Sequence, residues 1–468
     1  MKYDTLNILY DLFMDNLTIM HWVYLMLTII MCIMLIRKND ITLFCVVSIY
    51  IIAFLYSKSF LFSIQTICRG IMVAFEQFLP IFIGISLIMS MTCAMQVSGS
   101  NRLLLKPLER FLQTPTKSYL IVGITMFIVS TLIWPSPAVA LIGALLVPLA
   151  SKIGLSPIYT AVAINIFGHG VALSGDFFIQ GVPEVAARGA GFTSNELLPY
   201  LLPIWGITSI VTIAVSICIM RKDLNKSSNI VIKRAEEVKY NKYKSVLILV
   251  FMCIFFIIDI ICMLYFNITG DGATTLISGT ALIMTCIISF IVYSPKDALK
   301  MIPQFVEKGF GFSIKAFAPA VLIIAFFSLG NQEYASHILD EAAPGFIDDI
   351  ITQFVNNVDV TKELSTVIQM IVGALYSLDG SGFAGLSVIG NIARNIASTS
   401  EQVKILTALG QVEIMWIGGG TLIPWSVIPV AAVCNVSPGE LVRKNLIPVL
   451  TGLFAGMLMA IVMMLILV

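Results

Sequence analysis

Polar side chains that could bind a solute or an ion lie inside two apolar stretches of this chain, residues 134–182 and 379–433. Ionisable and hydrogen-bonding groups are costly in lipid, so their presence inside apolar segments favours a binding role. The expected solute-binding residues are Ser136, Asn165, His169, Ser381, Gly382, Asn391, Thr421 and Ser426. The expected ion-coupling carboxylates are Asp176, Asp379 and Glu413.

Both stretches also contain residues that interrupt helices. Pro135 and Pro137 flank Ser136, three glycines lie within residues 380–385, and residues 418–420 are all glycine. Irregular backbone at membrane depth survives only where protein or a water-filled cavity covers it. Its freed amides and carbonyls can then bind a ligand directly. Because glycines also flank His169, we expect a backbone break there as well.

Each candidate has a structural alternative. His169 could couple a proton or contact a substrate, since histidine changes charge near neutral pH, or it could be a neutral side chain bonded to a backbone carbonyl. Asp176 could lie at the membrane interface, where its charge costs little. Ser136 and Ser381 could bond back to their own helices. The glycines could form a packing face between helices.

The composition indicates a polytopic membrane protein made of helices. The chain has 468 residues, of which 58% are hydrophobic and only 12% are charged. Runs such as 17–36, 245–267 and 444–467 are long enough to cross a hydrocarbon core of about 30 Å. The net charge of +1 gives no sign of nucleic-acid binding. We find no catalytic motif and no metal-ligand spacing among the nine cysteines, so we expect no enzyme activity and no cofactor beyond a coupling Na⁺ or H⁺.

The second half of the chain repeats the first. Gly175-Asp176 corresponds to Gly420-Thr421, Glu196 to Glu440, and Pro203 to Pro448, in the same order. We therefore predict two internal repeats of about five to six transmembrane helices, each with a re-entrant hairpin and a broken helix. The predicted units are an interfacial segment at 1–16, repeat 1 at 17–220, a linker at 221–244 and repeat 2 at 245–468.

Charge in the loops predicts the orientation of the repeats. The linker 221–244 has eight Lys or Arg residues against three acidic ones, which places it in the cytoplasm by the positive-inside rule. Segment 331–360 has six acidic residues and no Lys or Arg, so it is expected outside. The two interrupted stretches are then entered from opposite sides, which makes the repeats inverted. A cytoplasmic linker requires one more crossing within 134–198 than we count, or one of these loop assignments is wrong.

Two segments carry a resemblance to known carriers. Asp379-Gly380-Ser381-Gly382 opens a predicted hairpin, and Gly418-Gly419-Gly420-Thr421-Leu422-Ile423-Pro424-Trp425-Ser426 follows it. Together with the duplicated plan, they resemble the ion transporter superfamily, which includes gluconate permeases, C4-dicarboxylate and citrate carriers and NhaC-type antiporters. The resemblance implies re-entrant hairpins, a central substrate site, coupling to sodium or protons, and often a homodimer. The hairpin tips of related carriers typically read Ser-Asn-Thr, and neither tip does here.

The sequence therefore predicts a secondary active transporter in the cell membrane, the inner membrane of a bacterium. It would carry a small solute, an organic anion such as a carboxylate, by symport with sodium or protons. One alternative is a sodium/proton antiporter without an organic substrate. Another is the membrane subunit of a multi-component permease, with the acidic segment 331–360 as a docking site.

Overall fold

In the computed structural model, every regular element of the described chain is a helix. The structure describes residues 17–36, 41–100, 103, 112–133, 135–178, 180–224, 241–266, 268, 270–356, 361–379, 382, 384–423 and 426–467. The predicted interfacial segment 1–16 and residues 225–240 of the predicted linker lie outside these ranges.

The first half contains twelve of the named helical elements. The first eleven are α2 (Ile19–Ile36), α3 (Thr42–Ser57), α4 (Phe60–Ser98), α6 (Pro115–Ile133), α7 (Pro135–Ala138), η1 (Val139–Gly143), α8 (Ala144–Lys152), α9 (Pro157–Asn165), η2 (Ile166–Ala172), α10 (Leu173–Gly175) and α11 (Gly181–Ala190). A long helix, α12 (Ser194–Leu224), completes this half.

The second half begins with α13 after the linker. Its elements are α13 (Lys242–Phe266), α14 (Gly270–Val292), α15 (Pro295–Ser328), α16 (Gln332–Ile338), α17 (Phe346–Asn356), α18 (Lys362–Tyr376), η3 (Ser377–Asp379), α19 (Ala384–Ile396), α20 (Ser400–Trp416), η4 (Ile417–Thr421), α21 (Ile428–Cys434) and α22 (Pro438–Leu467).

The spans expected from hydropathy agree with these helices. Among the described residues, six helices are long and apolar enough to cross a membrane, and four shorter apolar helices accompany them. The predicted span 444–467 falls inside α22, and the predicted span 245–267 coincides with α13 as far as Phe266. The helix that includes α9, η2 and α10 is apolar along its length but almost wholly buried by the rest of the protein. It therefore forms the interior of the molecule, where its polar side chains are shielded from lipid.

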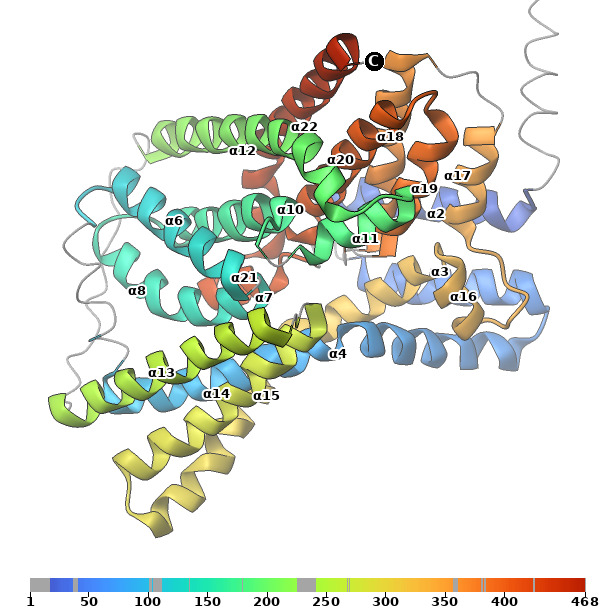
Figure 1. Cartoon of the computed structure of the whole chain (residues 1–468). Coiled ribbons are helices and arrows are strands. Elements are labelled where there is room, and N and C mark those ends of the chain that lie inside the picture. Colours follow the sequence, from blue (N-terminus) through green and yellow to red (C-terminus); the bar gives the residue numbers. More distant parts are fainter. Residues whose placement is uncertain are drawn as a thin grey trace, which may run out of the picture.

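The helices form two groups. In one, α4 packs along α15 and α14, with α3 and α13 beside them. This layer runs diagonally below the other elements in Figure 1. In the other group, α12 packs on α22, while α20 contacts α18, α19, α12 and α22. The interrupted stretches belong to this second group, so helices surround them on several sides (Figure 1).

Small residues allow the helices of each group to approach closely. A methyl group added at Gly309 of α15 would lie 2.1 Å from the carbonyl oxygen of Ser86 on α4. One added at Gly452 of α22 would lie 1.9 Å from the Thr212 hydroxyl on α12. Gly390 of α19 likewise meets the backbone of α11. In lipid, where apolar side chains gain little by leaving the solvent, such close packing is a main source of helix association.

The interrupted stretches are divided into short helical pieces, as the glycines and prolines predict. In the first stretch, α8 ends at Lys152 and α9 begins only at Pro157, and in the second stretch η4 contains a non-helical residue, Gly420, with φ of 129°. The predicted break beside His169 is wrong. Residues 166–172 form π-helical turns, and the helix ends only at Gly175. The glycines there instead leave room for side chains of neighbouring helices, since a methyl group added at Gly170 would lie only 2.3 Å from the Trp416 ring.

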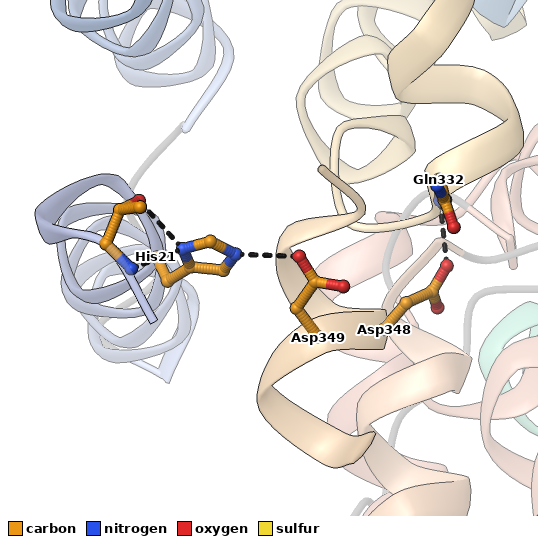
Figure 2. Close-up of polar contacts among 5 residues, drawn as sticks. His21, Gln332, Asp348 and Asp349 are labelled. Atoms are coloured by element: carbon orange, nitrogen blue, oxygen red, sulfur yellow. Dashed lines mark hydrogen bonds and ion pairs between the residues drawn. The ribbon is translucent and has the colours of Figure 1, made fainter. Parts of the chain in front are cut away.

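The acidic segment 331–360 contacts other parts of the same chain through helix α17. Figure 2 shows the His21 ring of α2 pointing at Asp349, with Nε2 3.0 Å from the carboxylate. The backbone N–H of Thr18 donates to His21 Nδ1 at 3.0 Å, so Nδ1 is the acceptor and Nε2 carries the proton. The ring is only 2% exposed and meets Phe346 edge to face. His21 thus fastens the start of α2 to α17.

The neighbouring carboxylate fastens α17 to the end of α18, just before the second interrupted stretch. Asp348 accepts a hydrogen bond from the backbone N–H of Gln332 at 2.8 Å (Figure 2) and one from the Tyr376 hydroxyl at 2.7 Å. Burial raises the pKa of Asp348, and these two bonds oppose that rise. Tyr376 is the last residue of α18, directly before η3.

Replacing His21 by alanine removes these contacts and leaves the Asp349 carboxylate and the Thr18 N–H without this partner. We expect the free energy of unfolding to fall by about 1–3 kcal/mol. The measurement is thermal unfolding of the purified protein in detergent. His337→Ala is the matched control, because His337 is exposed and surface substitutions usually change stability by less than about 0.5 kcal/mol. Equal effects of the two substitutions would contradict the role assigned to His21.

Candidate functional site

The two interrupted stretches meet at the centre of the second helix group. The amide Nδ2 of Asn165, at the end of α9, donates a hydrogen bond to the carbonyl oxygen of Gly420 in η4. The His169 ring lies against the same residue, since a methyl group added at Gly420 would be 2.6 Å from the ring carbon Cδ2. Residues 255 positions apart are therefore in direct contact, and both predicted residues, Asn165 and His169, lie at this point.

Asn445 of α22 completes the contact. Its Nδ2 donates to Asn165 Oδ1 at 2.6 Å and to the carbonyl oxygen of Thr421 at 2.9 Å. Sequence reasoning missed this residue. Its only signal in the sequence is an asparagine within an apolar helix. However, it follows Arg443 and Lys444, so it resembles part of a polar helix start.

The tip of the second interrupted stretch lies beside the same break. Gly382 has φ of 71°, and a methyl group added to it would lie 2.9 Å from the backbone nitrogen of Gly419. A methyl group at Gly418 would lie 2.9 Å from the Cα atom of Ser377. The glycines thus let two irregular backbone segments touch. The side chains of Ser136, Asp379 and Ser381 lie outside the described residues.

The remaining predicted binding residues take different positions. Thr421 is buried, and its hydroxyl donates to the carbonyl oxygen of Trp416. Ser426 is buried, and its hydroxyl donates to the carbonyl oxygen of Ile423 at 2.8 Å. Both hydroxyls keep lone pairs that can accept a further hydrogen bond. Asn391 is exposed on α19 and is not among the residues gathered at the break.

The two described carboxylates differ in their surroundings. Asp176 has left-handed backbone and accepts a hydrogen bond from the N–H of Val182 at 3.0 Å, so it holds the start of α11. Glu413 is buried in α20 against α18, where a methyl group at Gly373 would lie 2.4 Å from its Oε2. That Oε2 atom has no hydrogen-bond partner among the described residues. Glu413 is therefore the carboxylate better placed to take up a proton or a cation.

Several other buried polar atoms around the break lack hydrogen-bond partners within the described chain. They are His169 Nδ1, Ser174 Oγ, Gln411 Oε1, Trp416 Nε1 and Asn445 Oδ1. More than nine in ten buried polar groups in proteins are hydrogen-bonded, so these atoms are available to water or to a ligand. No group of three or more His, Cys, Asp or Glu side chains suited to a metal occurs in the described ranges.

An ion pair between the halves lies next to the site. Lys444 Nζ and the Tyr159 hydroxyl both donate to Oδ2 of Asp223, at the end of α12. The Lys444 ammonium also lies 5.5 Å from the centre of the Tyr159 ring. These contacts fix the positions of α9, α12 and α22 next to Asn165 and Asn445.

Comparison with known proteins gives one family. No family model matches the chain. The chain is 37% identical to the uncharacterized membrane protein YhfA of Bacillus subtilis (strain 168) over 442 residues, which cover 92% of this chain and 95% of that relative. The chain belongs to the YhfA family. The match extends through both halves, so the YhfA relative also contains both, and the protein described here is a membrane protein.

In this member of the YhfA family, Gly420→Ala should disturb the site where the two halves meet. Alanine at φ of 129° is strained, and its methyl group would displace His169. We expect a loss of about 1–3 kcal/mol in the free energy of unfolding. Gly206→Ala in α12 is the control, because a methyl group there meets no other atom within 4 Å and alanine favours helix by about 1 kcal/mol. Thermal unfolding in detergent measures the stability of both variants. A Gly420→Ala protein as stable as the natural one would contradict the expected backbone strain.

Proposed function

We propose that the protein is a secondary active transporter, which moves a small organic anion of the carboxylate class by alternating access coupled to sodium or protons. The contact of Asn165 with Gly420 is the main support. It joins a buried helix of one half to a broken helix of the other, within a membrane protein and among polar atoms without partners. Transporters place their substrate sites at such discontinuous helices between repeats.

The order of elements supports the two predicted internal repeats, on which the likeness to the ion transporter superfamily partly rests. In the first half, α6 is followed by the pieces α7 to α8, the buried helix α9 to α10, the short α11 and the long α12. In the second half, α18 is followed by η3 and α19, the buried helix α20 to η4, the short α21 and the long α22. Corresponding pieces thus follow one another in both halves, and each half supplies one of the two segments that meet at Gly420.

An anion at this site would be held mainly by neutral donors. Trp416 Nε1 is a donor without a partner among the described residues, and His169 would add a donor from its ring. Arg394, a candidate cation, is exposed on α19. Backbone N–H groups near the breaks are further donors, because helix ends leave such groups unpaired. This donor set suits one small carboxylate rather than a highly charged solute.

The test is thermal unfolding of the purified protein with a panel of carboxylates, in sodium chloride or in choline chloride at equal ionic strength. A bound ligand raises the stability of the folded state by about 2.7 kcal/mol at one hundred times its dissociation constant. We expect one carboxylate to raise the unfolding temperature, more strongly with its coupling cation, and expect Asn165→Ala to abolish the rise. Gly206→Ala should keep it. Absence of any carboxylate effect under all conditions would contradict an organic-anion substrate.

A sodium/proton antiporter is the second candidate, and Glu413 favours it. A buried carboxylate with an unpartnered oxygen can exchange a proton for a cation. If this candidate is correct, Glu413→Gln should abolish sodium-driven proton movement in proteoliposomes while the protein still folds, since glutamine has the same shape without the charge. Glu307→Gln, at an exposed position on α15, should retain it. Unchanged proton movement in Glu413→Gln would rule out this role.

The permease-subunit candidate has less support from the structure. Asp348 and Asp349 of the acidic segment contact His21, Gln332 and Tyr376 of the same chain. Asp340 likewise accepts a hydrogen bond from Tyr56 at 2.5 Å. These carboxylates already have partners within the chain, which leaves fewer charges for a docking protein.

A further inference from the structure

One carboxyl group of the first helix group, the layer of α4, α14 and α15, lies inside the apolar length of a membrane helix. Asp259 is the only charged residue of α13 after Lys244. It precedes the last residue of this helix, Phe266, by seven positions, or about 10 Å along the helix axis. Apolar side chains are exposed on α13 both before it, at Ile258, and after it, at Ile261. Asp259 therefore lies within the part of α13 that faces lipid.

The carboxyl group itself is turned into the seam between α13 and α14. Asp259 is only 3% exposed, and its Oδ1 accepts a hydrogen bond from the Thr280 hydroxyl of α14 at 2.8 Å. Its other oxygen, Oδ2, is buried and has no hydrogen-bond partner among the described residues. A charged carboxylate offers about four positions that accept hydrogen bonds. The single hydroxyl of Thr280 therefore leaves the charged form of Asp259 poorly satisfied.

The described seam also offers no positive charge to pair with Asp259. Helix α13 packs mainly on α14. Residues 276–284 of α14, within about one turn of Thr280, contain no titratable side chain, and the nearest one along α13 is Cys262. The other titratable side chains of the two helices lie farther along them, at Lys242, Tyr243, Lys244, Cys253, Tyr265, Asp271 and Cys286. Ionisable residues inside a membrane are normally paired or serve a function, so an unpaired Asp259 calls for another way of removing its charge.

We propose that Asp259 binds a proton in the seam between α13 and α14, and that this protonated carboxyl group is reachable from the lipid phase. With the proton on Oδ2 the group is neutral, while Oδ1 still accepts the Thr280 hydroxyl. Loss of the proton to water leaves a carboxylate that Thr280 alone cannot satisfy, so the seam has to admit water. The proton thereby controls how closely α13 packs on α14. The site is separate from the break at Gly420 and does not depend on the proposed function.

A hydrophobic carbodiimide is a suitable probe, because it enters lipid and adds to a carboxyl group that carries its proton. The carboxyl oxygen bonds to the central carbon of the reagent, and the proton moves to one of its nitrogens. Transfer of the acyl group to nitrogen then gives a stable N-acylurea, and nothing leaves. A carboxylate that has lost its proton does not begin this reaction, so the reagent reports both the proton and the access from lipid.

The experiment is treatment of the full-length protein in lipid nanodiscs with N,N′-dicyclohexylcarbodiimide at neutral pH, followed by peptide mass mapping. We expect the peptide that contains Asp259 to gain the mass of one reagent molecule, with fragment masses that place it on Asp259. The reaction should slow as the pH is raised, and a water-soluble carbodiimide should leave Asp259 unlabelled. Asp297→Asn, at an exposed position on α15, is the matched control and should be labelled at Asp259 as the natural protein is.

Two variants at the site complete the test. Asp259→Asn should lose the label from this peptide, and Asp259→Glu should keep it. Thermal unfolding in detergent shows whether each variant is folded, and if either is not, the fragment masses of the natural protein decide. Absence of the label from Asp259 in the natural protein would overturn the proposal. A rate that does not change with pH would also overturn it, as would equal labelling by the water-soluble reagent, which would make Asp259 an ordinary water-exposed carboxylate.

Discussion

The rest of the structure depends on how the backbone groups released at Gly420 are satisfied inside a membrane protein. An unpaired carbonyl in a medium without water costs several kcal/mol. The Gly420 carbonyl receives its hydrogen bond from Asn165, and the Thr421 carbonyl receives one from Asn445. Both donors are side chains on other helices. The break is therefore stable only when α9, α20 and α22 are assembled together, which couples the local geometry of the site to the packing of the whole second helix group.

Close packing is what allows these donors to reach the break. Gly452 and Gly456 let α22 lie against the threonines of α12, and Gly189 and Gly390 let α11 cross α19. The ion pair between Lys444 and Asp223 then fixes α22 along its length, one residue away from Asn445. Glycine thus has two separate uses in this chain. At Gly420 and Gly382 it permits a backbone with positive φ, whereas at the helix crossings it only provides space.

That double use explains what the sequence could and could not predict. Hydropathy predicted the membrane helices well, because a span must be apolar over most of its length whatever its neighbours are. The three glycines and the proline after α20 correctly predicted an interruption there. The glycines around His169 led to a wrong prediction, since they accommodate Trp416 and Met126 and the helix continues through π-helical turns. Asn445 was missed because its role depends on a hydrogen bond to Asn165, 280 residues away. A local sequence pattern cannot show which distant residues are in contact.

The length of α4 and α15 has a consequence for the surrounding lipid. At 1.5 Å per residue, the 39 residues of α4 extend about 58 Å, nearly twice the roughly 30 Å of a hydrocarbon core. Apolar side chains remain exposed near its start, at Phe60, Leu61 and Ile64, and again at Met72. A helix longer than the hydrocarbon core is accommodated by tilting, by kinking or by local thickening of the bilayer, each at a cost of a fraction of a kcal/mol per Å of mismatch. A change in bilayer thickness would therefore act first on the layer of α4 and α15, on which α7 and η1 of the first interrupted stretch pack.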